Sequence, residues 1–130
     1  MIYELDTDVL VKMIVSKLEE IDNLEVVLEN PQADSKFPCA VVSTPLKSIT
    51  ITEDGIPVRT NLSITIDYWT NKKYDSMKLS DMADKKMREL NFIRMNSPID
   101  QYDEVTKKYR FGGNYEAFFN GLTNSLERRI

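Results

Sequence analysis

The sequence has 130 residues, a net charge of -4 and no histidine, and 42% of its residues are hydrophobic. This length and composition predict one globular domain, residues 1–130, that buries its own core. With no histidine and with Cys39 as the one cysteine, the chain is a poor candidate for an enzyme, and we expect no cofactor and no metal site.

Neither a signal peptide nor a membrane span is expected near the start of the chain. The longest apolar run there, residues 9–15, is far below the roughly 20 residues that a spanning helix needs. We therefore expect synthesis in the cytoplasm. Charge is unevenly distributed, because residues 1–65 contain 5 Lys/Arg and 11 Asp/Glu, whereas residues 66–130 contain 12 and 10. The asymmetry favours head-to-tail association of like chains if the two halves separate in space, which the sequence leaves open.

The first predicted element is an amphipathic helix over residues 7–21, with Asp6 or Thr7 in position to cap it. Its apolar residues recur at helical spacing on one face, as Leu10, Ile14, Leu18 and Ile21. Residues 24–29 are then β-like, residues 30–38 form a loop, and residues 39–44 form a short apolar strand.

The clearest β signal lies in the middle of the chain. Residues 47–52 alternate between polar and apolar side chains, residues 53–55 (Glu-Asp-Gly) supply a turn, and residues 58–70 alternate again. One face of the second arm is polar, and the other carries Val58, Leu62, Ile64, Ile66 and Tyr68. This pattern predicts a long, protruding β-hairpin in an antiparallel sheet that is covered on one side.

A second helix is predicted over residues 75–90. Asn91 occupies the position where a residue with left-handed backbone closes a helix, and Phe92 would fold back on the last turn. The buried stripe of this helix is expected to consist of Leu79, Met82, Ala83, Met87 and Leu90.

The remaining residues predict strands at 93–96, 105–111 and 115–119, with a loop at 97–101. Gly112 and Gly113 mark a bulge or bend between the last two strands. Residues 121–130 are either a short helix or a loose tail. Together, the elements predict an α+β fold in which a single antiparallel β-sheet carries two main helices on one face.

Two acidic groups invite a catalytic interpretation, and each also has a simpler one. Asp100, Asp103 and Glu104 could hold Ca²⁺ or Mg²⁺ for a hydrolase, but they lack the ligand spacing of an EF-hand and fit a solvated loop. Asp81 and Asp84 are flanked by lysines, which predicts ion pairs on the helix surface.

A basic and aromatic group suggests single-stranded nucleic acid as a ligand. It consists of Lys72, Lys73, Lys85, Lys86 and Trp69. The chain is acidic overall, however, and carries no RNP-like motif, so a nucleic-acid-binding module is the alternative from a different functional class.

Three motifs carry a family resemblance. They are Pro-Cys-Ala-Val-Val at residues 38–42, Leu-Ser-Ile-Thr-Ile-Asp-Tyr-Trp-Thr-Asn at residues 62–71, and a helix that contains Ala-Asp and ends in Leu-Asn-Phe at residues 90–92. In this order, residues 10–119 resemble the tail terminator (tail completion) proteins of long-tailed bacteriophages, which include small minor tail proteins of Gram-positive siphophages. Members tend to have glycine where this chain has Asn91.

The resemblance implies a structural virion protein with no catalytic activity. Such a protein forms a ring, typically a hexamer, that caps the tail tube, stops its polymerisation and provides the head-joining surface. The implied partners are further copies of the chain, the tail tube protein and a head-completion or connector protein, while DNA passes through the lumen and no membrane is involved. The implied location is the head-proximal end of the phage tail. A head–tail connector or a tail-tube component is the alternative within the virion.

Eight residues are candidate inter-subunit or lumen contacts of such a ring, namely Lys47, Ile49, Ile51, Glu53, Asp54, Arg59, Arg128 and Arg129. Ile49 and Ile51 would touch a neighbouring subunit or, alternatively, cover the chain's own core. The acidic Glu53 and Asp54 would suit a lumen that DNA slides past without binding. The two C-terminal arginines would contact a neighbour or the tube, or belong to a frayed tail.

Overall fold

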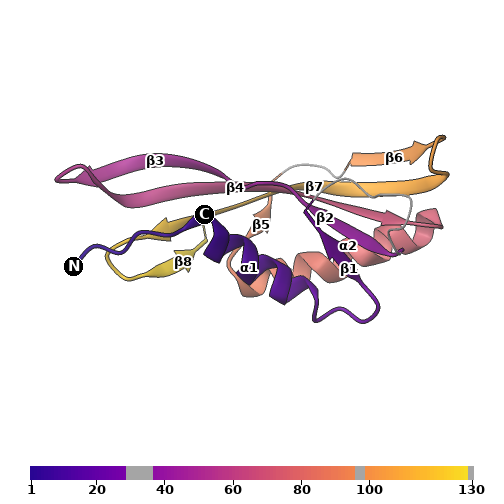
Figure 1. The fold of residues 1–130 in the computed structure, drawn as a ribbon, viewed down its shortest axis with the longest axis horizontal. Coiled ribbons are helices and arrows are strands. Elements are labelled where there is room, and N and C mark those ends of the chain that lie inside the picture. The colour runs from indigo at the N-terminus through magenta and orange to yellow at the C-terminus, as the bar shows by residue number, and fades with distance from the viewer. Residues whose placement is uncertain (29–36, 96–98, 129–130) are drawn as a thin grey trace.

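The centre of the structure, a computed structural model, is a pair of long antiparallel strands, β4 (Ile56–Thr70) and β7 (Lys108–Asn120) (Figure 1). Their pairing runs without interruption from Arg59 opposite Asn120 to Thr70 opposite Tyr109. The structure describes residues 1–28, 37–95 and 99–128, so most of the predicted loop at 30–38 lies outside the described residues.

Around this pair, the described residues form one eight-stranded sheet in the order β1-β2-β4-β7-β5, with β3 beside β4 and with β6 and β8 beside β7. Strands β1 and β2 pair in parallel, and the other described pairs are antiparallel. The α+β class is therefore confirmed, with a sheet that is mostly antiparallel. The outer strands are β1 (Glu25–Val27), β2 (Cys39–Val42), β3 (Leu46–Glu53), β5 (Ile93–Arg94), β6 (Ile99–Asp103) and β8 (Ser125–Glu127).

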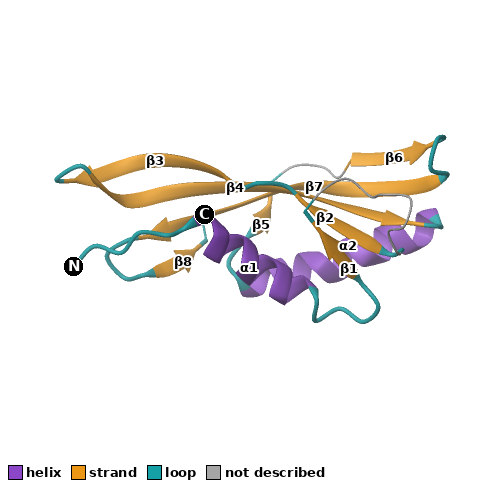
Figure 2. Ribbon diagram, in the orientation of Figure 1, coloured by secondary structure: helices purple, strands orange, loops and turns teal. Residues whose placement is uncertain are grey.

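Both helices, α1 (Thr7–Leu18) and α2 (Lys73–Glu89), lie on the same side of the sheet (Figure 2). They cover the apolar half of the alternating pattern of β4, as predicted. Burying one Leu or Ile side chain stabilises the fold by roughly 1.5–3 kcal/mol, so this layer supplies much of the stability. The core includes Leu10, Ile14, Leu18, Leu62, Ile64, Ile66, Leu79, Ala83, Met87, Phe92 and Ala117.

The C-terminal end of α2 is closed by the Leu-Asn-Phe sequence. Asn91 has a left-handed backbone with φ 68°. The backbone N–H of Phe92 donates to the carbonyl of Met87, and that of Asn91 donates to the carbonyl of Arg88, both at 2.9 Å. This is the hydrogen-bond pattern of a Schellman motif, and Phe92 is fully buried, which confirms the predicted helix stop. The Asn91 side chain also donates to the carbonyl of Leu126 at 2.8 Å, a bond that glycine could not make.

Some helix predictions were wrong in detail. The first helix ends at Leu18 instead of residue 21, and Ile21 reaches the core from the following turn, where Asn23 has a positive φ. Asp6 occupies the N-cap position but makes no side-chain capping bond. Met82 was placed in the buried stripe of the second helix, yet its side chain is 46% exposed, because it lies at the margin of the stripe formed by its neighbours.

The sequence after α2 contains more strands than predicted. Residues 99–101 form part of β6 instead of a loop, residues 125–127 form β8 instead of a helix or tail, and Val105 lies in the β6–β7 turn instead of a strand. Both new strands pair with β7, which also pairs with β5. Each forms a hairpin with β7, its neighbour in the chain, so their formation depends on the free edge of β7 and not on a strong alternating pattern of their own.

The predicted bulge at Gly112 and Gly113 is absent from the β4–β7 ladder, which continues through both residues. The sequence signal has a different cause. A Cβ atom on Gly112 would lie 2.6 Å from Asp67 Oδ1 and 2.8 Å from the Asp67 Cα, and it would also overlap the carbonyl oxygen of Ile66. Glycine is therefore needed at residue 112 because the neighbouring strand approaches closely, and not because the chain bends.

The β3–β4 hairpin turns at Asp54 and Gly55, which have φ 52° and 78°. Two positive φ values at the centre of a two-residue loop match the Asp-Gly turns favoured in hairpins. Register shifts on either side of Ile51 interrupt the predicted alternation of β3. Strand β7 pairs with β4 only as far as Arg59. Between Arg59 and the turn, the hairpin is therefore a two-stranded ribbon among the described strands. That the hairpin protrudes as a long arm stays a prediction.

Candidate functional site

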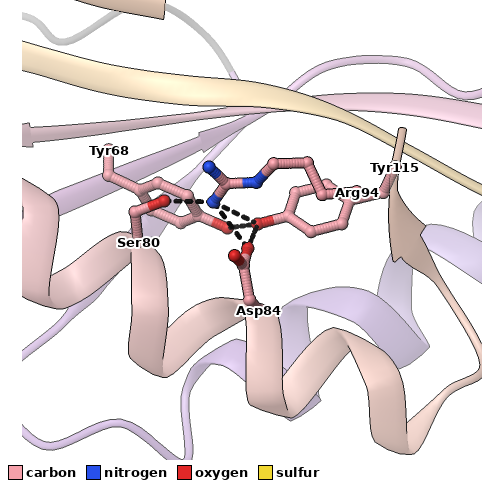
Figure 3. A network of polar contacts seen from close by, with 5 residues as sticks. All are labelled: Tyr68, Ser80, Asp84, Arg94 and Tyr115. Carbon is pink, nitrogen blue, oxygen red and sulfur yellow. Dashed lines mark hydrogen bonds and ion pairs between the residues drawn. The ribbon is translucent and has the colours of Figure 1, made fainter. Parts of the chain in front are cut away.

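A buried network of polar side chains lies between α2 and the sheet (Figure 3). Tyr68 comes from β4 and Tyr115 from β7, and these two tyrosines are fully buried. Ser80 and Asp84 come from α2, and Arg94 comes from β5. The network thus connects the three consecutive elements β4, α2 and β5 with the later strand β7.

Tyr115 is the centre of this network. Its hydroxyl donates to Asp84 Oδ1, so its single proton is used, and the Tyr68 hydroxyl must donate to the Tyr115 oxygen across 2.8 Å. One guanidinium nitrogen of Arg94 lies 2.6 Å from Asp84 Oδ1 and 3.4 Å from the Tyr115 oxygen, and it also donates to Ser80. Asp84 therefore pairs with Arg94 at a site with 20% side-chain exposure, and the predicted surface ion pairing of Asp84 was wrong.

The electrostatics keep the two tyrosines neutral and the guanidinium group of Arg94 charged. Burial raises the pKa of Tyr68 well above its ordinary value, and the nearby Tyr115 raises it further. Burial, followed by the hydrogen bond to Asp84, raises the pKa of Tyr115. Burial opposes the charge of Arg94, but its bonds to Tyr115 and Asp84 outweigh burial and raise the guanidinium pKa. These groups keep their protonation states at neutral pH, which suits a fixed structural connection better than proton transfer.

The sequence analysis selected none of these residues for this role. One signal is visible in retrospect, because Ser76, Ser80 and Asp84 recur every four residues beside the apolar stripe of α2, and both serines are buried. Tyr68 was correctly placed on the inward face of β4. Its hydroxyl had to find a partner there, since a buried hydroxyl without a hydrogen bond is costly.

The predicted contact residues of the hairpin fall on two faces. Lys47 and Ile49 lie opposite Leu62 and Thr60, on the helix side of the sheet, whereas Ile51 lies opposite Arg59 on the other side. The register shift next to Ile51 causes this separation, so the simple alternation that put both isoleucines on one face was wrong. Their side chains are 55% and 53% exposed, so neither covers the core.

The charged candidates have different environments. Lys47 donates to the carbonyl of Leu5 at 2.7 Å, and the Arg59 guanidinium lies 3.9 Å from the centre of the Phe118 ring. Glu53 and Asp54 are exposed at the hairpin tip, and Arg128 is exposed after β8. Arg129 lies outside the described residues.

Exposed apolar side chains gather on the hairpin. Leu46, Ile49, Ile51 and Ile56 are 70%, 55%, 53% and 39% exposed. Single exposed apolar residues are ordinary on protein surfaces, but this hairpin carries four, with Ile49 and Ile51 on opposite faces, so both of its faces offer apolar contacts that another protein can cover. The β3–β4 hairpin is our candidate functional site.

Several residues of the two alternative sites have other partners. Asp100 pairs with Lys73 at 3.3 Å, and Asp103 accepts a hydrogen bond from the backbone of Val105. In the described part of the chain, no group of three or more His, Cys, Asp or Glu side chains is placed to hold a metal ion. Of the basic candidates, Lys86 pairs with Glu20 at 3.0 Å, and the indole nitrogen of Trp69 is buried.

The comparisons with known proteins are brief. No family model and no curated protein matches this sequence. Among the described residues, neither helix is both long enough and apolar enough to cross a membrane.

Proposed function

We propose that this chain is a structural assembly protein of a bacteriophage virion, a tail terminator that forms a ring on the head-proximal end of the tail tube. The ring stops polymerisation of the tube and provides the surface that joins the head. The proposal rests on the motif resemblance, and the structural observation that supports it best is the apolar surface of the β3–β4 hairpin. Leu46, Ile49, Ile51 and Ile56 are exposed there in the isolated chain.

An exposed apolar ribbon at the edge of a sheet is expected to be covered in the working assembly, because long unprotected edges promote uncontrolled association. A closed ring covers such a surface on each copy with a different surface of the next copy. The exposed carboxylates of Glu53 and Asp54 at the tip would then suit the lumen, since DNA does not bind an acidic wall.

The test combines oligomer mass with tube growth. Native mass spectrometry over a range of concentrations should show a closed species of six copies, and the protein should stop elongation when added to polymerising tail tube protein. The variant Leu46→Thr/Ile51→Thr places β-branched threonine, which favours strands, at both positions and should weaken both effects. Val9→Thr on α1, where the side chain is also 45% exposed, is the matched control and should change neither.

Other outcomes separate the alternatives. Incorporation along the whole length of the tube would identify a tail-tube component, and binding to heads without any effect on tube length would identify a connector. Tight binding to a single-stranded oligonucleotide, weakening steeply with salt, would identify the nucleic-acid-binding module. Each of these results would overturn the terminator proposal.

A further inference from the structure

The β6–β7 turn presents an unusually exposed apolar side chain. Val105 at its tip is 93% exposed. The turn is ordered by two bonds to one residue, since Asp103 Oδ1 accepts from the Val105 N–H at 2.9 Å and the Asp103 carbonyl accepts from the Lys107 N–H at 2.7 Å. A preorganised turn loses little conformational entropy on binding, so Val105 is suited to be inserted into another surface.

A cavity of suitable size lies beside the hairpin. It has a volume of about 230 Å³ and is lined by the start of the chain, by the base of β3 and by the inner faces of β4 and β7. Its apolar walls include Leu5, Ile49 and Phe119, and Glu4, Asp6 and Lys47 provide charged groups. The Lys47–Leu5 hydrogen bond fastens the N-terminal segment to the hairpin across it.

The β6–β7 turn lies at one end of the long axis of the molecule, and the chain start and the β3–β4 hairpin, which contribute to the cavity, lie in the opposite half (Figure 1). The cavity end, residues 1–6, 46–59 and 118–128, has five acidic and three basic side chains. The turn end, residues 69–78 and 99–110, has six basic and four acidic side chains. The two ends therefore carry opposite net charges, which would steer one copy onto another in a head-to-tail arrangement.

We propose that Val105 of one copy inserts into the Ile49-lined cavity of a second copy. Lys107 then approaches Glu4 and Asp6 of the second copy, and Glu104 approaches its Lys47. The contact is heterologous, because the surface that inserts differs from the surface that receives it. Repetition of the contact closes a ring or continues as a filament, depending on the rotation between copies. That the repetition closes a ring rests on the proposed function, whereas the contact itself does not.

Two single variants test the contact in full-length protein. Val105→Asp removes the inserted group, and Ile49→Glu puts a charge into the receiving cavity beside Glu4 and Asp6. Both residues are more than half exposed, so both variants should fold, which circular dichroism would confirm. By sedimentation equilibrium, each variant alone should self-associate at least about tenfold more weakly than the wild type. The control Val9→Asp should associate as the wild type does.

A mixture of the two variants gives the decisive result. The intact turn of Ile49→Glu fits the intact cavity of Val105→Asp, but neither chain can extend the pair, so the mixture should form a one-to-one dimer and nothing larger. Unchanged association of Val105→Asp, a mixture without dimer, or a wild type that stays monomeric at millimolar concentration would overturn the contact. Six-copy rings of Val105→Asp that still cap tubes would overturn the contact and leave the proposed function in place. If the mixture forms the dimer but the wild-type chain cannot stop tube growth, the contact stands and the proposed function is overturned.

Discussion

The central position of Tyr115 in the buried network predicts an asymmetry between the two tyrosines. Tyr68→Phe removes one donor, while the Tyr115 oxygen keeps Arg94 as a donor, so this change should lower the free energy of unfolding by about 1 kcal/mol. Tyr115→Phe removes the bond to the carboxylate of Asp84 and also leaves the Tyr68 hydroxyl buried without its acceptor. The two effects together should cost about 3 kcal/mol.

The double variant Tyr68→Phe/Tyr115→Phe sharpens this prediction. Because the orphaned Tyr68 hydroxyl is gone, the double variant should cost about 2 kcal/mol, less than Tyr115→Phe alone and well below the sum of the single changes. Urea unfolding followed by circular dichroism measures all four proteins, with the exposed Tyr74→Phe as a control that should stay within about 0.5 kcal/mol of the wild type. Additive costs, or a cost of Tyr68→Phe equal to that of Tyr115→Phe, would refute the bonding scheme.

Three further predictions concern single positions. Gly112→Ala should lower the free energy of unfolding by about 2 kcal/mol or more, because the added methyl group would overlap Asp67; unchanged stability in urea would show that β4 and β7 separate easily. Asn91→Ala should lower the free energy of unfolding by about 2 kcal/mol, because alanine tolerates a positive φ poorly and cannot bond to Leu126. Asn91→Gly also loses the bond but adopts a positive φ freely, so it should cost about 1 kcal/mol less than Asn91→Ala. Equal costs would contradict the backbone argument. Burial, with a smaller contribution from the charge of Glu25, raises the pKa of Cys39 from 9.0 to about 11. The thiol therefore ionises at lower pH in the unfolded chain than in the folded protein. Its contribution to the free energy of unfolding is fully present below pH 9, and the free energy should fall by up to about 2 kcal/mol between pH 9 and 11. Thermal unfolding against pH should show a smaller alkaline loss for Cys39→Ala, and identical profiles would contradict the assignment.

The predictions that succeeded rest on local signals. The helix period of α2, the left-handed residue at its end and the alternation of β4 each follow from residues close together in the sequence. Their physical causes act over a few residues, so a single sequence displays them. The α+β class followed from the same signals.

The predictions that failed depend on strand pairing and on contacts between distant residues. Strands β6 and β8 form hairpins with β7, their neighbour in the chain, although their own alternation is weak. Gly112 faces Asp67, which lies 45 positions earlier in the chain. Asp84 was predicted to form ion pairs with its lysine neighbours on the helix surface. Its partners are instead Arg94 and Tyr115, which come from two strands that follow the helix. The register shift in β3 was also missed, because the sequence alternates regularly between polar and apolar residues there. For the candidate site, the pairing of β3 with β4 was predicted, the faces of its isoleucines were not, and its role as a contact surface stays a prediction.

The β4–β7 ladder has a consequence for how the chain reaches its fold. Its paired residues are separated by roughly 40 to 60 positions, which gives the protein a high contact order and predicts slow folding. During synthesis, β4 leaves the ribosome beside β3 and is followed by α2, so the hairpin and the helix can form early. The central ladder cannot be completed until residue 120 has emerged. Throughout that interval, the edge of β4 that later receives β7 is open, and the nascent chain depends on α2 to shield its apolar face from neighbouring chains.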